Sequence, residues 1–157
     1  MKETLDLNDL MYELAIKVRL LELRLNADKT AGLSKNEELF LELVDKAGTE
    51  RVSNIASQLR GLSQSMISII IKNLSDNKQL ISKKDDPADK RQTLITLTDH
   101  GKETLSAIRD VKLKLYNAIR TALNTKPVEE EIICKAIQRA LQFFEDKLLS
   151  DRIEAKF

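Results

Sequence analysis

Cationic side chains are the groups in this sequence whose type and spacing best suit a defined chemistry. Lys83 and Lys84 stand just before the acidic run at Asp85 and Asp86, and Lys90 and Arg91 follow a few residues later. Ammonium and guanidinium groups are the side chains that neutralise phosphates. This stretch is therefore a candidate contact with a polyanion.

The distribution of charge along the chain points to the same chemistry. The formal net charge of the 157 residues is only +1, but residues 51–120 carry 13 basic and 7 acidic side chains. Residues 1–50 carry 7 basic and 11 acidic side chains, and residues 121–157 carry 6 and 7. A basic centre between acidic or near-neutral flanks predicts a nucleic-acid-binding segment between two segments with another role.

Residues for catalysis or metal binding are scarce. His100 is the only His, at the predicted start of a helix, where an exposed or structural role is expected. Cys134, the only Cys, stands beside Ile133 on a predicted helix, where a small buried apolar residue is the expected role. One Cys and one His exclude disulfide frameworks and multi-cysteine metal sites, and no phosphate-binding Gly-rich loop or nucleophile elbow is present. We therefore expect neither an enzyme nor a bound cofactor or metal.

Two short helices joined by a turn are predicted to present the central segment. Ser34 begins a capping box for a helix that extends to about Lys46. A short helix capped by Ser53 and a second helix capped by Ser63 follow, with the turn at Gly61 between them. This spacing is typical of a helix-turn-helix.

The second of these helices has one apolar face and one mixed face. Its predicted buried residues, at helical spacing, are Ile67, Ile70, Ile71 and Leu74. The residues left on or near the outward side, with the cap, are Ser63, Gln64, Ser65, Met66, Ser68, Ile69 and Lys72. They are the candidates for base and phosphate contacts.

A β-hairpin is predicted directly after this helix. Leu80 and Ile81 lead into one strand, and the alternating run Thr93–Thr98 forms another. Between them, Asp85–Arg91 has the composition of a charged turn, and Thr98 caps the next helix. The predicted fold class is thus mostly α, a winged helix-turn-helix with a small β wing. Alternatively, the charged tip only keeps the hairpin edge solvated.

Long helices with apolar stripes are predicted at both ends of the chain. We divide the chain into residues 1–30, an N-terminal dimerisation helix, residues 31–100, the winged DNA-binding region, and residues 101–157, C-terminal helices that also dimerise. The stripe residues that we expect at the dimer interface are Leu7, Leu10, Leu14, Ile133, Ile137 and Phe144.

The sequences Asp86-Pro87-Ala88-Asp89-Lys90-Arg91 and Leu97-Thr98-Asp99-His100-Gly101 resemble the wing and the following helix of the MarR family of bacterial transcriptional regulators. The resemblance covers residues 33–105 by motif and the whole chain by layout. It implies a homodimer on a pseudo-palindromic operator, with Arg91 in the minor groove and Asp89 orienting it. It also implies a small-molecule effector in a cleft between the dimerisation helices and the winged helix, and we expect a repressor that this effector releases. Arg19 and Arg24 would bind an amphipathic acid there or form intersubunit ion pairs, which we favour.

The second helix departs from that family at three positions. Relatives often carry Arg near Gln64 and Ile69 and Thr near Met66. The amide of Gln64 matches adenine, and Met66 and Ile69 can cover thymine methyl groups, so we expect an A·T-rich operator. The alternative is a helical protein–protein adaptor that has lost sequence-specific DNA binding.

The remaining expectations concern compartment and partners. The sequence has no apolar stretch near the ~20 residues of a membrane span and no signal-peptide pattern at its N-terminus. We therefore expect a cytoplasmic protein whose partners are double-stranded DNA, a second copy of itself and an effector, with no membrane contact.

Overall fold

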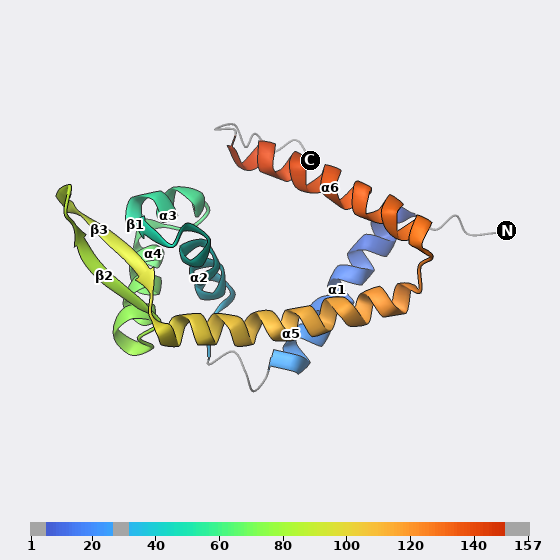
Figure 1. Cartoon of the computed structure of the whole chain (residues 1–157), viewed down its shortest axis with the longest axis horizontal. Helices are drawn as coiled ribbons and strands as arrows, with labels where there is room; N and C mark the ends of the chain where they lie inside the picture. Colours follow the sequence, from blue (N-terminus) through green and yellow to red (C-terminus); the bar gives the residue numbers. More distant parts are fainter. Residues whose placement is uncertain (1–5, 27–31, 150–157) are drawn as a thin grey trace. The chain divides into compact units, whose positions relative to one another are not determined.

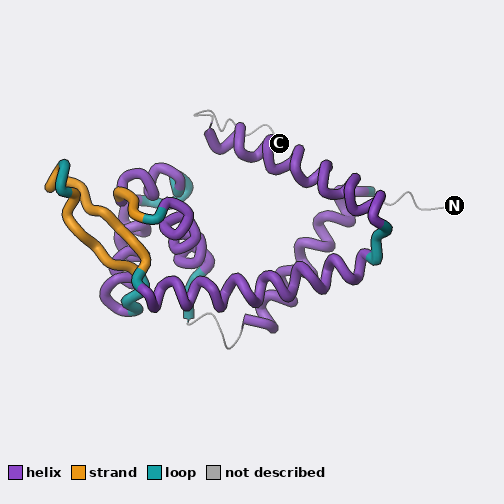
Figure 2. The backbone as a smooth tube through the Cα atoms, viewed as in Figure 1, coloured by secondary structure: helices purple, strands orange, loops and turns teal. Residues whose placement is uncertain are grey.

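The computed structural model describes residues 6–26 and 32–149. Figure 1 labels its elements, and Figure 2 shows that helices and one small sheet make up the described chain. The order is α1 (Leu7–Asn26), α2 (Lys35–Ala47), β1 (Thr49–Arg51), α3 (Val52–Gln58), α4 (Gln64–Lys72), the π-helix η1 (Asn73–Asn77), β2 (Ile81–Asp86), β3 (Asp89–Leu97), α5 (Asp99–Leu123) and α6 (Pro127–Leu149). The predicted class, a mostly helical winged fold, is confirmed.

Three helices begin at the residues that the sequence predicts. Ser34 Oγ accepts a hydrogen bond from the Glu37 amide at 3.2 Å, and Glu37 Oε2 accepts one from the Ser34 amide at 2.7 Å. Ser63 Oγ accepts from the Met66 amide at 3.2 Å, and Thr98 Oγ1 accepts from the Gly101 amide at 2.9 Å. These bonds satisfy amides that a helix leaves unpaired in its first turn.

The start of α3 differs from the prediction. The helix begins at Val52, and Arg51 occupies the cap position with no side-chain cap bond. Strand β1 runs directly into α3, so Ser53 already lies inside the helix. Its hydroxyl lies 3.3 Å from Oε1 of Gln92 on β3 and donates a hydrogen bond there.

The wing is larger than predicted. Its sheet has the antiparallel order β1-β3-β2, so β1 adds a third strand to the predicted hairpin. Strand β3 begins at Asp89 rather than near Thr93, which shortens the expected loop to a tip at Pro87 and Ala88. The long β2–β3 ladder holds the charged residues in extended conformation, which their turn-forming composition did not indicate.

One hydrophobic core joins the helix-turn-helix to the sheet and the first turns of α5. Its fully buried members include Phe40, Leu41, Val44, Ile55, Leu74, Leu80, Ile95 and Leu105. Ile67 and Ile70 of α4 are buried as predicted, whereas Ile71 is only partly buried at the edge of this core. The core fixes α4 and the base of the wing as parts of one body.

The contacts of the chain divide it into two compact units, residues 1–115 and residues 116–157. The second unit holds the end of α5 and α6, joined at Asn124, which has a positive φ of 42°. Within it Arg120 and Glu130 form an ion pair at 2.5 Å. The long helices have many exposed apolar side chains, including Leu7, Leu10 and Leu14 on α1 and Ile137 and Phe144 on α6, whereas Ile133 is half-buried.

Candidate nucleic-acid interface

Helix α4 presents the predicted outward residues to solvent. All of Ser63, Gln64, Ser65, Met66, Ser68, Ile69 and Lys72 are exposed. Met66 and Ile69 are 45% and 59% exposed, although apolar side chains of that size are usually buried. The face therefore combines exposed apolar groups with polar ones.

The hydroxyl groups of this face are already engaged within the helix. Besides capping the Met66 amide, the Ser63 hydroxyl lies 2.9 Å from that of Ser65. The Ser68 hydroxyl donates to the carbonyl oxygen of Gln64 at 3.0 Å. The Gln64 amide and the Lys72 ammonium are therefore the long polar groups with which α4 reaches outward.

Helix α2 contributes a neighbour that the sequence did not suggest. Asn36, in the first turn of α2, brings its Nδ2 to 3.9 Å from Sδ of Met66. The two residues are 30 positions apart, and only the packing of α2 beside α4 brings them together. Asn36 therefore belongs to the same exposed surface as the outward face of α4.

At the tip of the wing, Asp89 and Arg91 form the predicted pair. Asp89 Oδ1 accepts hydrogen bonds from both the backbone amide and Nε of Arg91, each at 3.1 Å. The side chain of Arg91 is 90% exposed. Lys90, between them, is exposed as well. The guanidinium is thus held at its base by a carboxylate while its outer edge faces solvent.

Lys83 and Lys84, predicted as one group, lie on opposite faces of the wing. Lys83 pairs in register with the buried Ile95, so it shares the core-facing side of the sheet, whereas Lys84 points the other way. Lys83 Nζ lies 3.3 Å from Oδ1 of Asp76 on η1. The Ser75 hydroxyl first, and then Lys83, hold the pKa of Asp76 below its usual value. The structure therefore brings only one of the two lysines to the side of η1.

Asp86, in the turn of the wing motif, is held by contacts within the protein. Its carboxylate is buried, Oδ1 accepts the Ala88 amide at 2.9 Å, and Oδ2 lies 2.6 Å from Nη2 of Arg51 on β1. The Ala88 amide is the main cause that lowers the pKa of Asp86, and the Arg51 guanidinium adds to it. No sequence signal indicated this pair, because 35 residues separate its members.

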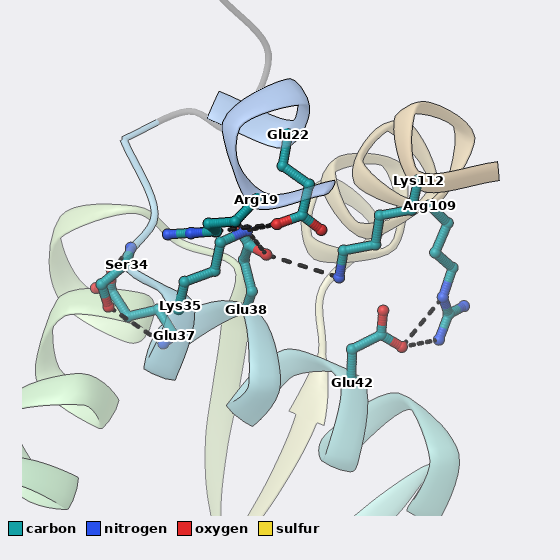
Figure 3. A network of polar contacts seen from close by, with 9 residues as sticks. All are labelled: Arg19, Glu22, Ser34, Lys35, Glu37, Glu38, Glu42, Arg109 and Lys112. Carbon is teal, nitrogen blue, oxygen red and sulfur yellow. Dashed lines mark hydrogen bonds and ion pairs between the residues drawn. The ribbon is translucent and has the colours of Figure 1, made fainter. Parts of the chain in front are cut away.

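A second polar cluster joins α1, α2 and α5 at one end of the winged unit (Figure 3). Glu38, which is buried, contacts Lys35 at 3.0 Å and Lys112 at 3.6 Å, and Lys35 also reaches Glu22 of α1 at 3.9 Å.

Arg109 of α5 contacts Glu42 of α2 at 2.6 Å and Asp45 at 2.8 Å. Arg19, which we expected to pair between subunits, contacts Glu22 of its own helix at 3.0 Å.

The acidic residues at the start of α2 have structural roles. Burial opposes ionisation of Glu37, but the hydrogen bonds from Ser34 and the contact with Lys78 outweigh it and lower its pKa. Lys78 Nζ lies 3.3 Å from Glu37 Oε2 and donates to the Gly32 carbonyl at 2.8 Å. These contacts tie the start of α2 to the end of η1.

The single His and the single Cys of the sequence were the candidates for other chemistry. His100 and Cys134 are exposed, so the expectation that Cys134 is buried is wrong for the single chain. Across the described ranges, no three His, Cys, Asp or Glu side chains gather as metal ligands. None of the helices in those ranges is long and apolar enough to cross a membrane.

Comparisons with known proteins agree with this geometry. A family model described as transcriptional regulator SarA/Rot matches residues 23–108. The uncharacterized HTH-type transcriptional regulator YxaD of Bacillus subtilis is 30% identical over 136 residues, which span 86% of this chain and 92% of that protein.

Solved structures show the same fold. Wild-type apo MarR from E. coli is similar with a TM-score of 0.68 at 15% identity, over 89% of this chain and 99% of that one. BpsR of Bordetella bronchiseptica, whose DNA binding is regulated by 6-hydroxynicotinic acid, has a TM-score of 0.62 at 17% identity, over 89% of this chain and 96% of that one.

Proposed function

The chain belongs to the SarA/Rot family of transcriptional regulators, with the winged-helix fold of MarR, and we propose that it binds an A·T-rich, pseudo-palindromic operator as a homodimer. It acts through DNA binding and not as an enzyme. The observation that carries the proposal is the exposed Arg91 guanidinium held by Asp89 at the wing tip.

The wing supplies the minor-groove contact. A narrow A·T-rich groove concentrates negative potential, so a guanidinium that is already oriented gains more there than on an open surface. The carboxylate of Asp89 accepts a hydrogen bond from Nε of Arg91, and the Arg91 side chain is 90% exposed, so the outer edge of the guanidinium faces the solvent. Lys84 and Lys90 are placed for phosphates beside this groove.

Helix α4 supplies the major-groove contact. Gln64 pairs with N6 and N7 of adenine, and Met66 and Ile69 cover thymine methyl groups. Lys72 neutralises a phosphate beside α4, and Lys83 neutralises one from the face of the wing opposite Lys84. Met66 and Ile69 are exposed to water in the free protein, so covering them with thymine methyl groups removes apolar surface from water. This gain supports the proposed preference for A·T pairs.

The homodimer is formed by α1 and α6. Each helix exposes apolar side chains along its length, such as Leu10 and Leu14 on α1 and Ile137 and Phe144 on α6. Exposed apolar rows of this kind are commonly covered by another chain. A twofold dimer presents two α4 helices to two half-sites, which makes the operator pseudo-palindromic.

We further propose that the chain represses transcription until a small molecule lowers its operator affinity. The regulation of DNA binding in BpsR by 6-hydroxynicotinic acid supports such an effector. The ion pairs among α1, α2 and α5 join a dimerisation helix to the winged unit (Figure 3). A ligand that displaces one of them would change how the two α4 helices are presented.

The alternative, a protein–protein adaptor, is tested by the salt dependence of binding to random duplex DNA. If the chain binds DNA by neutralising phosphates, log K falls linearly with log salt concentration. We expect a steep negative slope for the purified protein, and no measurable binding from an adaptor. Arg91→Ala should weaken binding by about 1–3 kcal/mol and Asp89→Ala by less. Equal binding by wild type and both variants would contradict the minor-groove role.

A further inference from the structure

The wing tip is fastened to the body of the protein by one arginine outside the wing hairpin. Arg51, the last residue of β1, directs Nε and Nη2 to Oδ2 of Asp86 at 2.7 and 2.6 Å. The Asp86 side chain is only 8% exposed, so this ion pair is shielded on the carboxylate side. Two short bonds to one buried oxygen make a strong, oriented contact.

From Asp86 the contacts continue to the groove-binding guanidinium. The other oxygen of Asp86 accepts the Ala88 amide at 2.9 Å, which holds the turn, and Asp86 faces Asp89 across the ladder. Asp89 in turn accepts both the amide and Nε of Arg91. An unbroken series of contacts therefore runs from β1 through the tip to Arg91.

The place of Arg51 in the chain explains how this series of contacts can hold the wing tip. Arg51 lies at the junction of β1 and α3, so it is part of the helix-turn-helix, and it pairs in register with Leu94. The tip residues Pro87, Ala88 and Lys90 are exposed and have no core of their own. A two-stranded hairpin is marginally stable by itself, so its tip needs an anchor to hold one geometry.

We propose that Arg51 is a positioning residue for DNA recognition: through Asp86 it fixes the wing tip so that Arg91 enters the minor groove in a set direction. The inference rests on the proposed function. Arg51 acts through Arg91, because a preorganised side chain loses less entropy on binding.

A direct contact of Arg51 with a DNA phosphate is a competing role, since its side chain is 41% exposed. Asp86→Asn separates the two. It removes the negative partner but leaves the Arg51 cation, so a phosphate contact would be kept or strengthened. If Arg51 acts by positioning, Asp86→Asn weakens binding in the same way as Arg51→Gln.

The test measures affinity of the full chain for poly(dA–dT) duplex by fluorescence anisotropy, with poly(dG–dC) duplex for comparison. Arg51→Gln and Asp86→Asn should each weaken binding to poly(dA–dT) by about fivefold or more, with Arg51→Lys in between. In an Arg91→Ala background, the same changes should alter affinity less than about twofold, because coupled residues are not additive. Lys114→Gln, which removes an exposed cation from α5, is the matched control and should lower affinity only slightly.

A second measurement needs no DNA. In the free protein, ¹⁵N order parameters of the Ala88 and Asp89 amides should fall in Arg51→Gln and Asp86→Asn, while those of the α4 amides stay near the wild-type values. Unchanged order parameters would overturn the proposal. So would equal losses with and without Arg91, or full affinity in Asp86→Asn. Loss of affinity in Arg91→Ala alone would refute the anchor but keep the proposed function, whereas failure of wild type to bind either duplex would refute both.

Discussion

Gly101→Ala should destabilise the protein strongly, because Gly101 lies where α5 meets the chain segment that leads into the wing. A Cβ at this position would stand 2.0 Å from the carbonyl oxygen of Leu80, whereas ordinary contact begins at 3.4 Å. The obstacle is backbone and not a flexible side chain. The backbone of Leu80 is also fixed by two hydrogen bonds. Its carbonyl accepts one from the Thr98 amide at 3.0 Å, and its amide donates one to the Leu74 carbonyl at 2.7 Å.

The size of the effect follows from this geometry. The two segments have to separate by about 1.4 Å, and overpacking of a core costs about 1–3 kcal/mol, here at the upper end because two backbone hydrogen bonds are strained together. For a chain of this length, about 3 kcal/mol corresponds to a fall in melting temperature of roughly 6–12 °C.

Urea unfolding and thermal melting at one fixed protein concentration measure this loss. Gly61→Ala is the matched control: it lies in the turn between α3 and α4, no atom stands within 4 Å of its Cβ position, and its φ is not in the left-handed region. That variant should be as stable as wild type or gain a few tenths of a kcal/mol. If Gly101→Ala and Gly61→Ala unfolded at the same urea concentration, the close approach of α5 to Leu80 would be wrong.

Leu14→Asp and Ile137→Asp should each shift sedimentation toward monomer and weaken DNA binding together; a fully folded wild-type monomer at micromolar concentration would contradict the dimer. Gln64→Ala should relax the preference for one adenine in each half-site, whereas Lys72→Ala should weaken all sequences alike and reduce the salt slope by about one; the reverse pattern would exchange their roles. The pKa of Asp86 is lowered, so its stabilisation is present above the ordinary carboxyl value of about 3.9 and is lost as pH falls through its folded-state pKa. The difference in urea midpoint between wild type and Asp86→Asn should therefore be constant from pH 7 to about 5 and shrink below about pH 4, and a difference that grew in acid would contradict the assignment.

Local signals in the sequence were enough to predict much of the fold. Ser34, Ser63 and Thr98 cap the helices they were predicted to cap, because a cap is decided within one turn of its own helix. Apolar spacing likewise identified the buried face of α4. Ser53 failed as a cap because β1, a three-residue strand with no alternating pattern, runs straight into α3.

Local sequence patterns could not predict contacts between residues that are far apart in the chain. The pairing of Arg51 with Asp86 and the approach of Asn36 to Met66 depend on the packing of separate elements. The contact of Lys83 with Asp76 likewise depends on how β2 packs beside η1. The proposed base contacts of Gln64, Met66 and Ile69 remain predictions, supported by exposure and by side-chain chemistry.

The most direct test of the central claim is selection of bound sequences from random duplex DNA by the purified full-length chain. The account predicts a pseudo-palindrome with two A·T-rich half-sites whose centres lie about 10–10.5 base pairs apart, roughly 34–36 Å, one turn of the double helix. It also predicts A·T pairs at the minor-groove steps that Arg91 reaches, and loss of that flanking preference in Arg91→Ala. A G·C-rich consensus, or tight binding with no consensus, would contradict the account of how α4 and the wing read DNA.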